Sequence, residues 1–430
     1  MDKEKVKEKM GVWKKRLAFL KPWNMDEEDQ DDDLEIRSMQ ANDTSREARE
    51  ESPEFIWFKG KNGKIYLAGG IAALVLLVAG GFWYYSGHHL FTEYVVTSTA
   101  ESLDIAGTQY AMLGDSVIKY SPDGVFCVDS HNTSKWSVAY SMQSPIIDIC
   151  KNTMVVAEQQ GNQVYVMNEK GPMGNFETDL PVLKACVSAQ GVVALVQEDD
   201  PVTWVNLYDC NGTKLAGVKT TMEDSGYPLD AAITENGEKL MVSFLGVAQG
   251  ELKGRIAFYD FSSGLANGDN CLTGILDYPG QIFPEVYFAD SSTPVGLWDH
   301  GFAVFGDGES LEEKRSVSFE SEIVSSFHDE EYVGFVFHNE AEDCRYRMEL
   351  YRYSGRRSME QEFDCDYQEV KMDSGKILLY DAKNCTVYST SGAQNFATDY
   401  EKQVEYFGKV PGYRRYLVIT NDSMDRIRIS

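Results

Sequence analysis

Histidine is the side chain that most often performs acid–base or metal chemistry near neutral pH, and this sequence of 430 residues contains only six. None of them lies in an H-E-x-x-H segment, and the sequence also lacks G-x-S-x-G and a glycine-rich phosphate loop that ends in lysine. We therefore assign no catalytic residue and favour a role without catalysis. The histidines are His88, His89, His131, His300, His328 and His338.

Two acidic turns are the remaining candidates for metal binding. Glu198, Asp199 and Asp200 form one of them, and Asp307 and Glu309 flank a glycine in the other. Calcium prefers carboxylate and carbonyl oxygens, but neither turn has the regular ligand spacing of a known calcium loop. We expect solvated turns, with no metal-binding and no cofactor-binding residue assigned.

Eight cysteines could form disulfides or hold a metal ion. None lies in a C-x-x-C pair, and several lie among apolar residues typical of strands, where cysteine acts as a small hydrophobic side chain. We favour mostly buried free thiols over disulfides. They are Cys127, Cys150, Cys186, Cys210, Cys271, Cys344, Cys365 and Cys385.

The segment that organises the rest of the chain is Ile65 to Tyr85, which contains no charged residue. A helix of this length is about 31 Å long, close to the ~30 Å hydrocarbon core of a bilayer. Lys59, Lys61 and Lys64 precede it, whereas the next cation is at position 119. The positive-inside rule then predicts a single-pass membrane protein with a cytoplasmic N-terminus and an extracytoplasmic C-terminal domain at residues 86–430.

The apolar segment also contains pairs of small residues four positions apart. Ala68 and Ala72, and Gly69 and Ala73, are spaced as in helices that approach each other closely in membranes. A weak homodimer through this helix is an option that the sequence leaves open.

Two segments precede the apolar run. Residues 1–24 alternate cations with apolar residues at helical spacing and could contact the anionic inner leaflet, dock a partner, or remain a partly disordered tail. Residues 25–64 comprise an acidic, disordered spacer and the juxtamembrane residues.

The part of the chain after the apolar run is strongly acidic. It contains 26 Lys and Arg against 52 Asp and Glu, a net charge of −26. A domain with this charge repels phosphate backbones and anionic headgroups. We therefore exclude nucleic-acid binding and expect the domain to stand away from the membrane surface.

Short alternating runs of β-branched and aromatic residues fill this acidic part, each ending in a polar turn. The glycines that close these turns recur every 37–52 residues, which is the period of four-stranded β-propeller blades. We predict an all-β propeller, with a pair of β-sandwiches as the alternative. The closing glycines are Gly171, Gly212, Gly264, Gly308, Gly355 and Gly392.

A second recurring segment marks the first strand of successive blades. Seven units fit between about residues 105 and 398, and three more strands begin at Val404, Arg415 and Arg426. We predict that Phe91 to Ser98 supplies the missing strand of an eighth blade, with seven blades as the runner-up. The markers are SPIID from Ser144, LPVLKA from Leu180, YPLDAA from Tyr227, FPEVYF from Phe283 and EIVSSF from Glu322.

Two segments resemble a known repeat. DGVFCVDSHNTSKW, from Asp123 to Trp136, is similar to the repeat of quinoprotein-type (PQQ-like) propellers, in which Asp-Gly leads a strand that ends in Asp and a Trp follows. GKILLYDAKNCTVYSTSG, from Gly375 to Gly392, is a looser copy. Residues 60–430 as a whole resemble uncharacterised single-pass membrane-anchored propellers of Gram-positive Clostridia, which are known only as a domain of unknown function.

Together these features predict a binding or scaffold module, whose propeller recognises an envelope protein or a cell-wall partner outside the membrane. Loops on a rigid scaffold commonly perform recognition of this kind. An extracytoplasmic enzyme, either a quinone-dependent dehydrogenase or a glycan-cleaving enzyme, is one alternative. A transmembrane signalling protein is the other.

Overall fold

The computed structural model describes residues 63–105, 107–200, 202–221, 225–248, 250–262, 271–306, 312–339 and 344–430. The chain divides into two units between Ile71 and Ala72, and all of the described strands belong to the second. The predictions for residues 1–24, for the spacer as far as residue 62 and for the acidic turn at 307–309 lie outside the described residues.

One helix, α2 (Gly63–His88), coincides with the apolar segment of the sequence. Apolar side chains in the middle of this helix are exposed, and Leu76 and Leu77 are 72% and 74% exposed. In the part of the chain that the structure describes, no helix meets the length and apolarity needed to cross a membrane.

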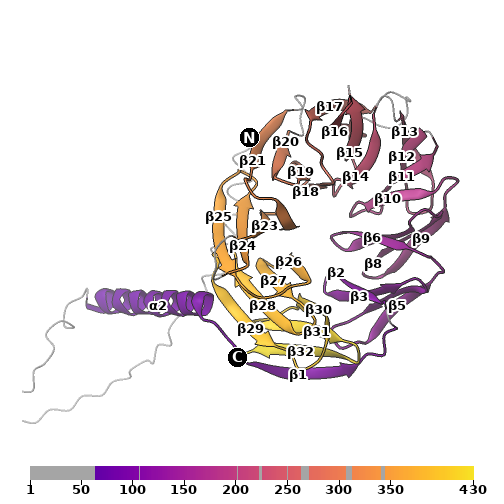
Figure 1. Ribbon diagram of the computed structural model, residues 1–430. Coiled ribbons are helices and arrows are strands. Elements are labelled where there is room, and N and C mark those ends of the chain that lie inside the picture. Colours follow the sequence, from indigo (N-terminus) through magenta and orange to yellow (C-terminus); the bar gives the residue numbers. More distant parts are fainter. Residues whose placement is uncertain are drawn as a thin grey trace, which may run out of the picture. The chain divides into compact units, whose positions relative to one another are not determined.

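The strands of the described residues form eight antiparallel sheets of four strands each, arranged as blades around a central axis (Figure 1). Blades 1 to 4 are built from consecutive strands. They are blade 1, β2 (Gln109–Leu113), β3 (Ser116–Ser121), β4 (Gly124–Val128) and β5 (Ser134–Ala139); blade 2, β6 (Pro145–Cys150), β7 (Thr153–Glu158), β8 (Gln163–Asn168) and β9 (Gly171–Glu177); blade 3, β10 (Val182–Val187), β11 (Val193–Asp199), β12 (Val202–Tyr208) and β13 (Lys214–Thr221); and blade 4, β14 (Tyr227–Ile233), β15 (Lys239–Ala248), β16 (Glu251–Asp260) and β17 (Leu272–Pro279).

Blades 5 to 7 follow the same pattern, and blade 8 combines strands from the two ends of the ring. They are blade 5, β18 (Glu285–Phe288), β19 (Pro294–Trp298), β20 (Gly301–Phe305) and β21 (Glu313–Ser318); blade 6, β22 (Ile323–His328), β23 (Tyr332–His338), β24 (Tyr346–Arg352) and β25 (Arg357–Phe363); blade 7, β26 (Glu369–Asp373), β27 (Lys376–Tyr380), β28 (Asn384–Ser389) and β29 (Gln394–Asp399); and blade 8, β30 (Val404–Lys409), β31 (Arg415–Thr420), β32 (Ser423–Ile429) and β1 (Tyr94–Glu101). The prediction of an eight-bladed all-β propeller is confirmed, and paired sandwiches are excluded.

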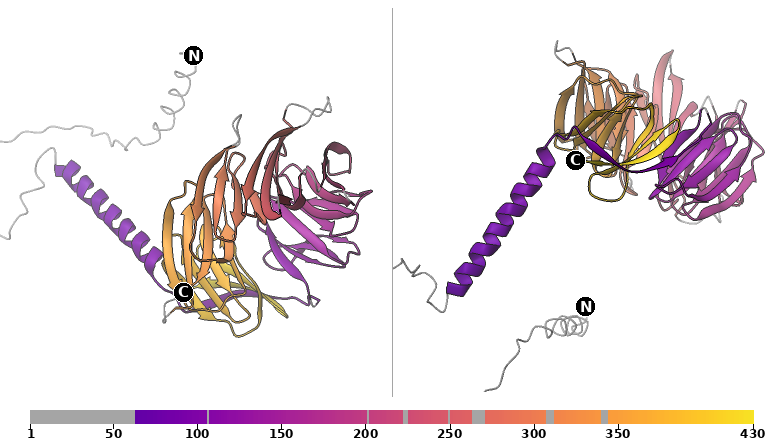
Figure 2. Two further views of the ribbon diagram at one scale, coloured as in Figure 1. Left: turned by 45° about the horizontal axis from the view of Figure 1, so that its top comes forward. Right: turned by 90° about the horizontal axis from the view of Figure 1, so that it is seen from below.

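Blade 8 closes the ring by pairing β1 with β32. The two strands run antiparallel, from Tyr94 opposite Ile429 to Glu101 opposite Ser423. Figure 2 shows β1 beside the C-terminal strands of this blade. The closing strand begins three residues later than predicted, because Phe91 instead forms a parallel bridge with Phe396 of blade 7 and is buried there.

Apolar clusters occupy the spaces between neighbouring blades. Val155 of blade 2 packs with Val193 of blade 3, and Val117 of blade 1 packs with Leu417 of blade 8. Burial of one such side chain stabilises the fold by about 1.5–3 kcal/mol. Strands in the middle of a blade are covered on both faces and read as continuous apolar runs, whereas outer strands such as β17 alternate between half-buried and exposed residues.

The polar turns that revealed the repeat are held by aspartate side chains. Asp209 Oδ1 accepts hydrogen bonds from the backbone N–H groups of Asn211, at 2.9 Å, and Thr213, at 2.8 Å. The N–H of Thr213 contributes most to a pKa of Asp209 below its usual value. Gly212 completes the turn with a φ of +84°, a conformation that costs glycine little because it has no Cβ.

The expectation of mostly buried thiols holds for three of the eight cysteines, and the other five are half-buried. None of the eight, all of which lie among the described residues, forms a disulfide, and the buried ones are Cys127, Cys186 and Cys385. In the repeat that resembles quinoprotein-type propellers, Trp136 donates from Nε1 to the carbonyl oxygen of Glu169, at 3.2 Å, and so joins blade 1 to blade 2.

Candidate functional site

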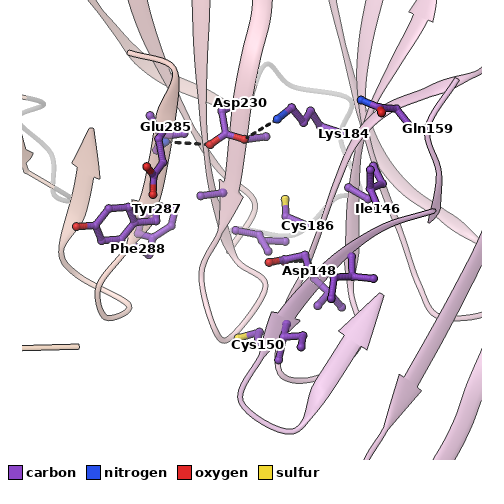
Figure 3. Close-up of a pocket in the computed structure, with 18 of the residues that line it drawn as sticks. Ile146, Asp148, Cys150, Gln159, Lys184, Cys186, Asp230, Glu285, Tyr287 and Phe288 are labelled. Carbon is purple, nitrogen blue, oxygen red and sulfur yellow. Dashed lines mark hydrogen bonds and ion pairs between the residues drawn. The ribbon is translucent and has the colours of Figure 1, made fainter. Parts of the chain in front are cut away.

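The inner strands of the propeller surround a pocket of about 620 Å³ on the ring axis. Its walls come from β6, β10, β14 and β18, from the end of β22, and from Gln109 and Tyr120 of blade 1. Figure 3 shows the side chains that enter the pocket from blades 2 to 5. Because blades 1 to 6 all contribute lining residues, residues far apart in the sequence meet here.

Asp148 on β6 links blade 2 to blade 3. Its Oδ2 accepts a hydrogen bond from the backbone N–H of Val187 on β10, at 2.7 Å. Burial raises the pKa of Asp148 to about 6, the nearby Asp230 adds to this increase, and the N–H groups of Val187 and Ile149 oppose it. No cation lies within ion-pair distance of Asp148 among the described residues.

Asp230 on β14 makes the corresponding link between blades 4 and 5. Its Oδ2 accepts from the N–H of Val286, at 2.9 Å, and its Oδ1 lies 3.6 Å from Nζ of Lys184 (Figure 3). Burial raises the pKa of Asp230, Glu285 adds to this effect, and the N–H of Val286 and the charge of Lys184 oppose it. The two aspartates therefore fix the blades as well as line the pocket.

Glu285 on β18 makes contacts with blade 6. Its Oε2 accepts from Oγ of Ser326, at 3.0 Å, and its Oε1 lies 3.5 Å from Nε2 of His328. The imidazole of His328 stacks on Tyr287 with a centroid distance of 3.6 Å. Burial favours the neutral form of Glu285, but the hydrogen bonds and charge from His328 and Ser326 outweigh it and lower the pKa.

Two thiols also line the pocket, Cys150 and Cys186. Burial raises the pKa of Cys150 to about 11, and the negative charge of Asp148 adds to this effect. The pKa of Cys186 is raised well above its usual value, again mainly by burial. Both groups are therefore protonated at neutral pH, and a protonated thiol is a poor nucleophile.

Charged side chains from three blades meet at one end of the axis. Lys151, Glu235 and Glu330 each follow an inner strand, in blades 2, 4 and 6. Nζ of Lys151 forms an ion pair and hydrogen bond with Glu330 and lies 4.0 Å from Oε2 of Glu235. These side chains are exposed, so the bridge spans the axis but contributes little stability.

Of the histidines singled out by sequence, the structure brings His328 into the pocket. His131 contacts Nη1 of Arg426 at 2.5 Å, His300 pairs with its neighbour Asp299, and His338 stacks on a tyrosine of blade 6. No group of three or more His, Cys, Asp or Glu that could hold a metal ion is found in the described part of the chain.

The pocket carboxylates were not singled out from the sequence, although a signal for them exists. Asp148, Asp230 and Glu285 each occur within a segment that marks an inner strand, namely SPIID, YPLDAA and FPEVYF. A carboxylate in a strand predicted to face the axis of a propeller is an indication of a polar axial pocket.

Comparison with curated protein sequences finds no match. Among solved structures, the chain is similar to BamB from Moraxella catarrhalis, with 12% identity and a TM-score of 0.47, over 78% of this chain and 98% of that chain. It is similar to the Dos1 propeller, with 10% identity and a TM-score of 0.49, over 79% and 95%. It is also similar to the Pan2 WD40 domain of Neurospora crassa, with 11% identity and a TM-score of 0.41, over 67% and 89%.

One family profile matches residues 87–429, and its description is "Family of unknown function (DUF5711)". The match spans all eight blades, from before β1 to the end of β32. The predicted resemblance to a family of unknown function is thereby confirmed, while its Clostridial, membrane-anchored and quinoprotein-like particulars stay predictions. The chain belongs to this family of unknown function, DUF5711.

Proposed function

We propose that the protein is a membrane-anchored, extracytoplasmic binding module whose axial pocket receives a basic segment of an envelope protein. The observation that carries this proposal is Asp148, a carboxylate in the pocket with no cation beside it among the described residues. An incoming lysine or arginine would supply the missing positive charge. A charge-assisted hydrogen bond of this kind contributes roughly 1.5–3 kcal/mol.

The electrostatics of the whole pocket support a cationic ligand. Asp148, Asp230 and Glu285 converge from three blades, and the basic side chains among the described lining residues are Lys184 and His328. The domain around the pocket carries a net charge of −26. Such a field attracts basic partners and increases their association rates.

The pocket chemistry favours binding over catalysis. Cys150 and Cys186 are protonated by burial, and the two aspartates hold backbone N–H groups of neighbouring blades. A general base or nucleophile needs a free lone pair directed at substrate. The pair formed by Glu285 and His328 is the feature that an enzymatic alternative would have to use.

The proposed anchor and orientation are supported by the uncharged segment from Ile65 to Tyr85 and by the lysines that precede it. In intact protoplasts, added protease should digest residues 86–430 while an N-terminal tag survives. Loss of the tag together with survival of the C-terminal part would reverse the proposed topology.

The partner can be captured with a photo-reactive amino acid at Gln159, which lines the pocket, in the full-length protein in its own membrane. We expect a protein adduct whose contact segment is basic, and a lower yield in Asp148→Asn. The same amino acid at Ser137, an exposed position on the outer strand β5, is the matched control.

Equal adduct yields in the parent protein and in Asp148→Asn would contradict the proposal. Adducts that contain only cell-wall fragments would replace the protein partner with a polymer. Turnover of a small molecule that is lost in Glu285→Gln would favour the enzymatic alternative.

A further inference from the structure

A second pocket, of about 240 Å³, lies where blade 7 meets the closing blade 8. Its walls include Lys376 on β27, Lys409 at the end of β30, and Arg414 in the loop before β31. We propose that this cationic pocket binds an anionic group of the phosphate type, either free or as a lipid headgroup. This site goes beyond the proposed partner binding and does not depend on it.

The ammonium groups of these two half-buried lysines lack the carboxylate partner that usually accompanies a cation shielded from water. Among the described residues, no carboxylate lies within ion-pair distance of Nζ of Lys376 or Lys409. Lys376 donates to Oδ1 of Asn395 at 2.8 Å, and Lys409 lies 3.4 Å from the carbonyl oxygen of Gly412. These neutral acceptors leave donors and charge on both lysines for an anion.

The charged form of Lys376 is held at an energetic cost. Burial lowers the pKa of Lys376, and the positive charge of Lys409 lowers it further. Oδ2 of Asp373, at the end of β26, accepts a hydrogen bond from the backbone N–H of Lys409 at 2.8 Å. An anion between the two ammonium groups would offset the cost of burying the charge of Lys376 and would reduce its repulsion from Lys409.

Arg414 is fixed at the pocket wall by an unusual backbone conformation. Its φ is +54°, in the left-handed region that residues other than glycine seldom adopt. The guanidinium lies 3.8 Å from the ring centroid of Phe91 and so stacks on this aromatic wall. A strained residue held by its surroundings is often found at ligand sites.

The pocket is also connected to the end of α2. Asn395 is 7% exposed, and its Nδ2 donates to the carbonyl oxygen of Gly87 in the last turn of that helix, at 2.8 Å. If α2 is the membrane anchor of the proposed function, this pocket lies close to the membrane surface, because Asn395 contacts the last turn of that helix. That placement, which rests on the proposed anchor, makes a lipid headgroup a source of the anion.

The test uses the full-length protein in nanodiscs of phosphatidylcholine, with the pKa of Lys376 followed by NMR of isotopically labelled lysine. Inorganic phosphate added to these discs tests a free anion, and discs that contain phosphatidylglycerol test a headgroup. We expect at least one of the two probes to raise the pKa of Lys376, because a bound anion favours the charged lysine.

Variants separate the site from general charge effects. Lys409→Met should weaken binding of the effective probe about tenfold, because one charge-assisted contact is lost. Lys409→Arg keeps the charge and should retain most of the affinity. Lys383→Met, which removes an exposed cation of blade 7 outside the pocket, is the matched control and should bind normally.

The outcomes are distinct. A response to phosphatidylglycerol alone identifies a headgroup site, and a response to inorganic phosphate identifies a site for free anions. No change in the pKa of Lys376 with either probe would overturn the proposal, as would equal weakening by Lys409→Met and Lys383→Met. Neither result would affect the adducts at Gln159 that test the axial pocket.

Discussion

The axial pocket and the cationic pocket hold opposite charges in different ways. In the axial pocket, Asp148 and Asp230 accept backbone N–H groups from the next blade, so the same carboxylates join the blades and line the cavity. In the cationic pocket, the ammonium groups of Lys376 and Lys409 hydrogen-bond to neutral oxygens and form no ion pair with a carboxylate in the described part of the chain. The charges of the axial pocket therefore support the architecture in addition to facing a ligand, whereas those of the cationic pocket are available to a ligand alone.

Burial nevertheless disfavours the charged form of the side chain in both pockets. It raises the pKa of Asp148 and lowers the pKa of Lys376, which in each case disfavours the charged form. A ligand of opposite charge would reverse both shifts. The comparison therefore predicts that mutations in the axial pocket reduce stability as well as partner binding, whereas mutations in the cationic pocket act mainly on binding.

The largest expected effect comes from opening the ring, because both pockets depend on the positions of the blades. Deletion of residues 423–430 removes β32 and leaves β1 and β31 with unpaired edges. We expect the protein with this deletion, otherwise complete, to lose cooperative thermal unfolding and to elute as aggregates in size-exclusion chromatography. Thr97→Ala, which removes one exposed hydrogen bond to the carbonyl of Arg426, should cost less than about 1 kcal/mol. A deletion variant that melts like the parent would refute this closure.

The next largest effect concerns the structural role of the axial carboxylates. Asp148→Ala removes the acceptor for the N–H of Val187 and should lower the free energy of unfolding by about 1–3 kcal/mol at pH 7. Asp148→Asn keeps an acceptor oxygen and removes a buried charge, so it should be at least as stable as the parent. Denaturant titration of both variants measures the difference, and equal losses would show that the hydrogen bond to Val187 does not matter.

The pH dependence of stability sharpens the same point. The pKa of Asp148 is about 6 in the folded protein and 3.8 for the ordinary side chain, which represents the unfolded protein. Between these two pH values the folded state therefore binds more protons than the unfolded state. Stability relative to Asp148→Asn should therefore be greatest below about pH 4 and fall as the pH rises from there through 6, by roughly 1–3 kcal/mol. A difference between the two proteins that is constant from pH 4 to 7 would contradict the raised pKa.

The smallest effect is expected for stability in the cationic pocket. Lys376→Met removes a charge that burial and Lys409 disfavour, but it also removes the partner of Oδ1 of Asn395. These contributions oppose each other, so the free energy of unfolding should change by less than about 1 kcal/mol. A loss as large as that of Asp148→Ala would indicate that Lys376 is a structural residue, and the contrast between the pockets would fail.

Much of the fold could be predicted because each blade repeats the same local pattern. Segments such as SPIID and YPLDAA became inner strands β6 and β14, and the alternating strand at Arg426 became part of β32. The start of the closing strand was wrong by three residues. The aromatic ring of Phe91 fits the core between blades 7 and 8, a tertiary contact that strand periodicity does not reveal.

The candidate sites were less predictable because they depend on the ring and not on local sequence. Asp148, Asp230 and Glu285 are distant in the chain and converge only when successive blades face a common axis. Lys376 and Lys409 belong to different blades, and Arg414 lies in the loop that follows. The spacing of these residues along the sequence does not indicate that they line a common pocket. The carboxylates in the inner-strand segments could nevertheless have suggested the axial pocket.

The pairing of β1 with β32 also constrains the order of events during synthesis. Thr97 and its partner Arg426 are separated by 329 residues, so β1 leaves the ribosome long before its partner exists. At ~5–20 residues per second, the first strand waits roughly 15–65 s for completion of the blade. During this interval its polar edge is open to other chains. A holding factor or a temporary internal partner for β1 would therefore protect the nascent protein, and slower translation would lengthen the period of risk.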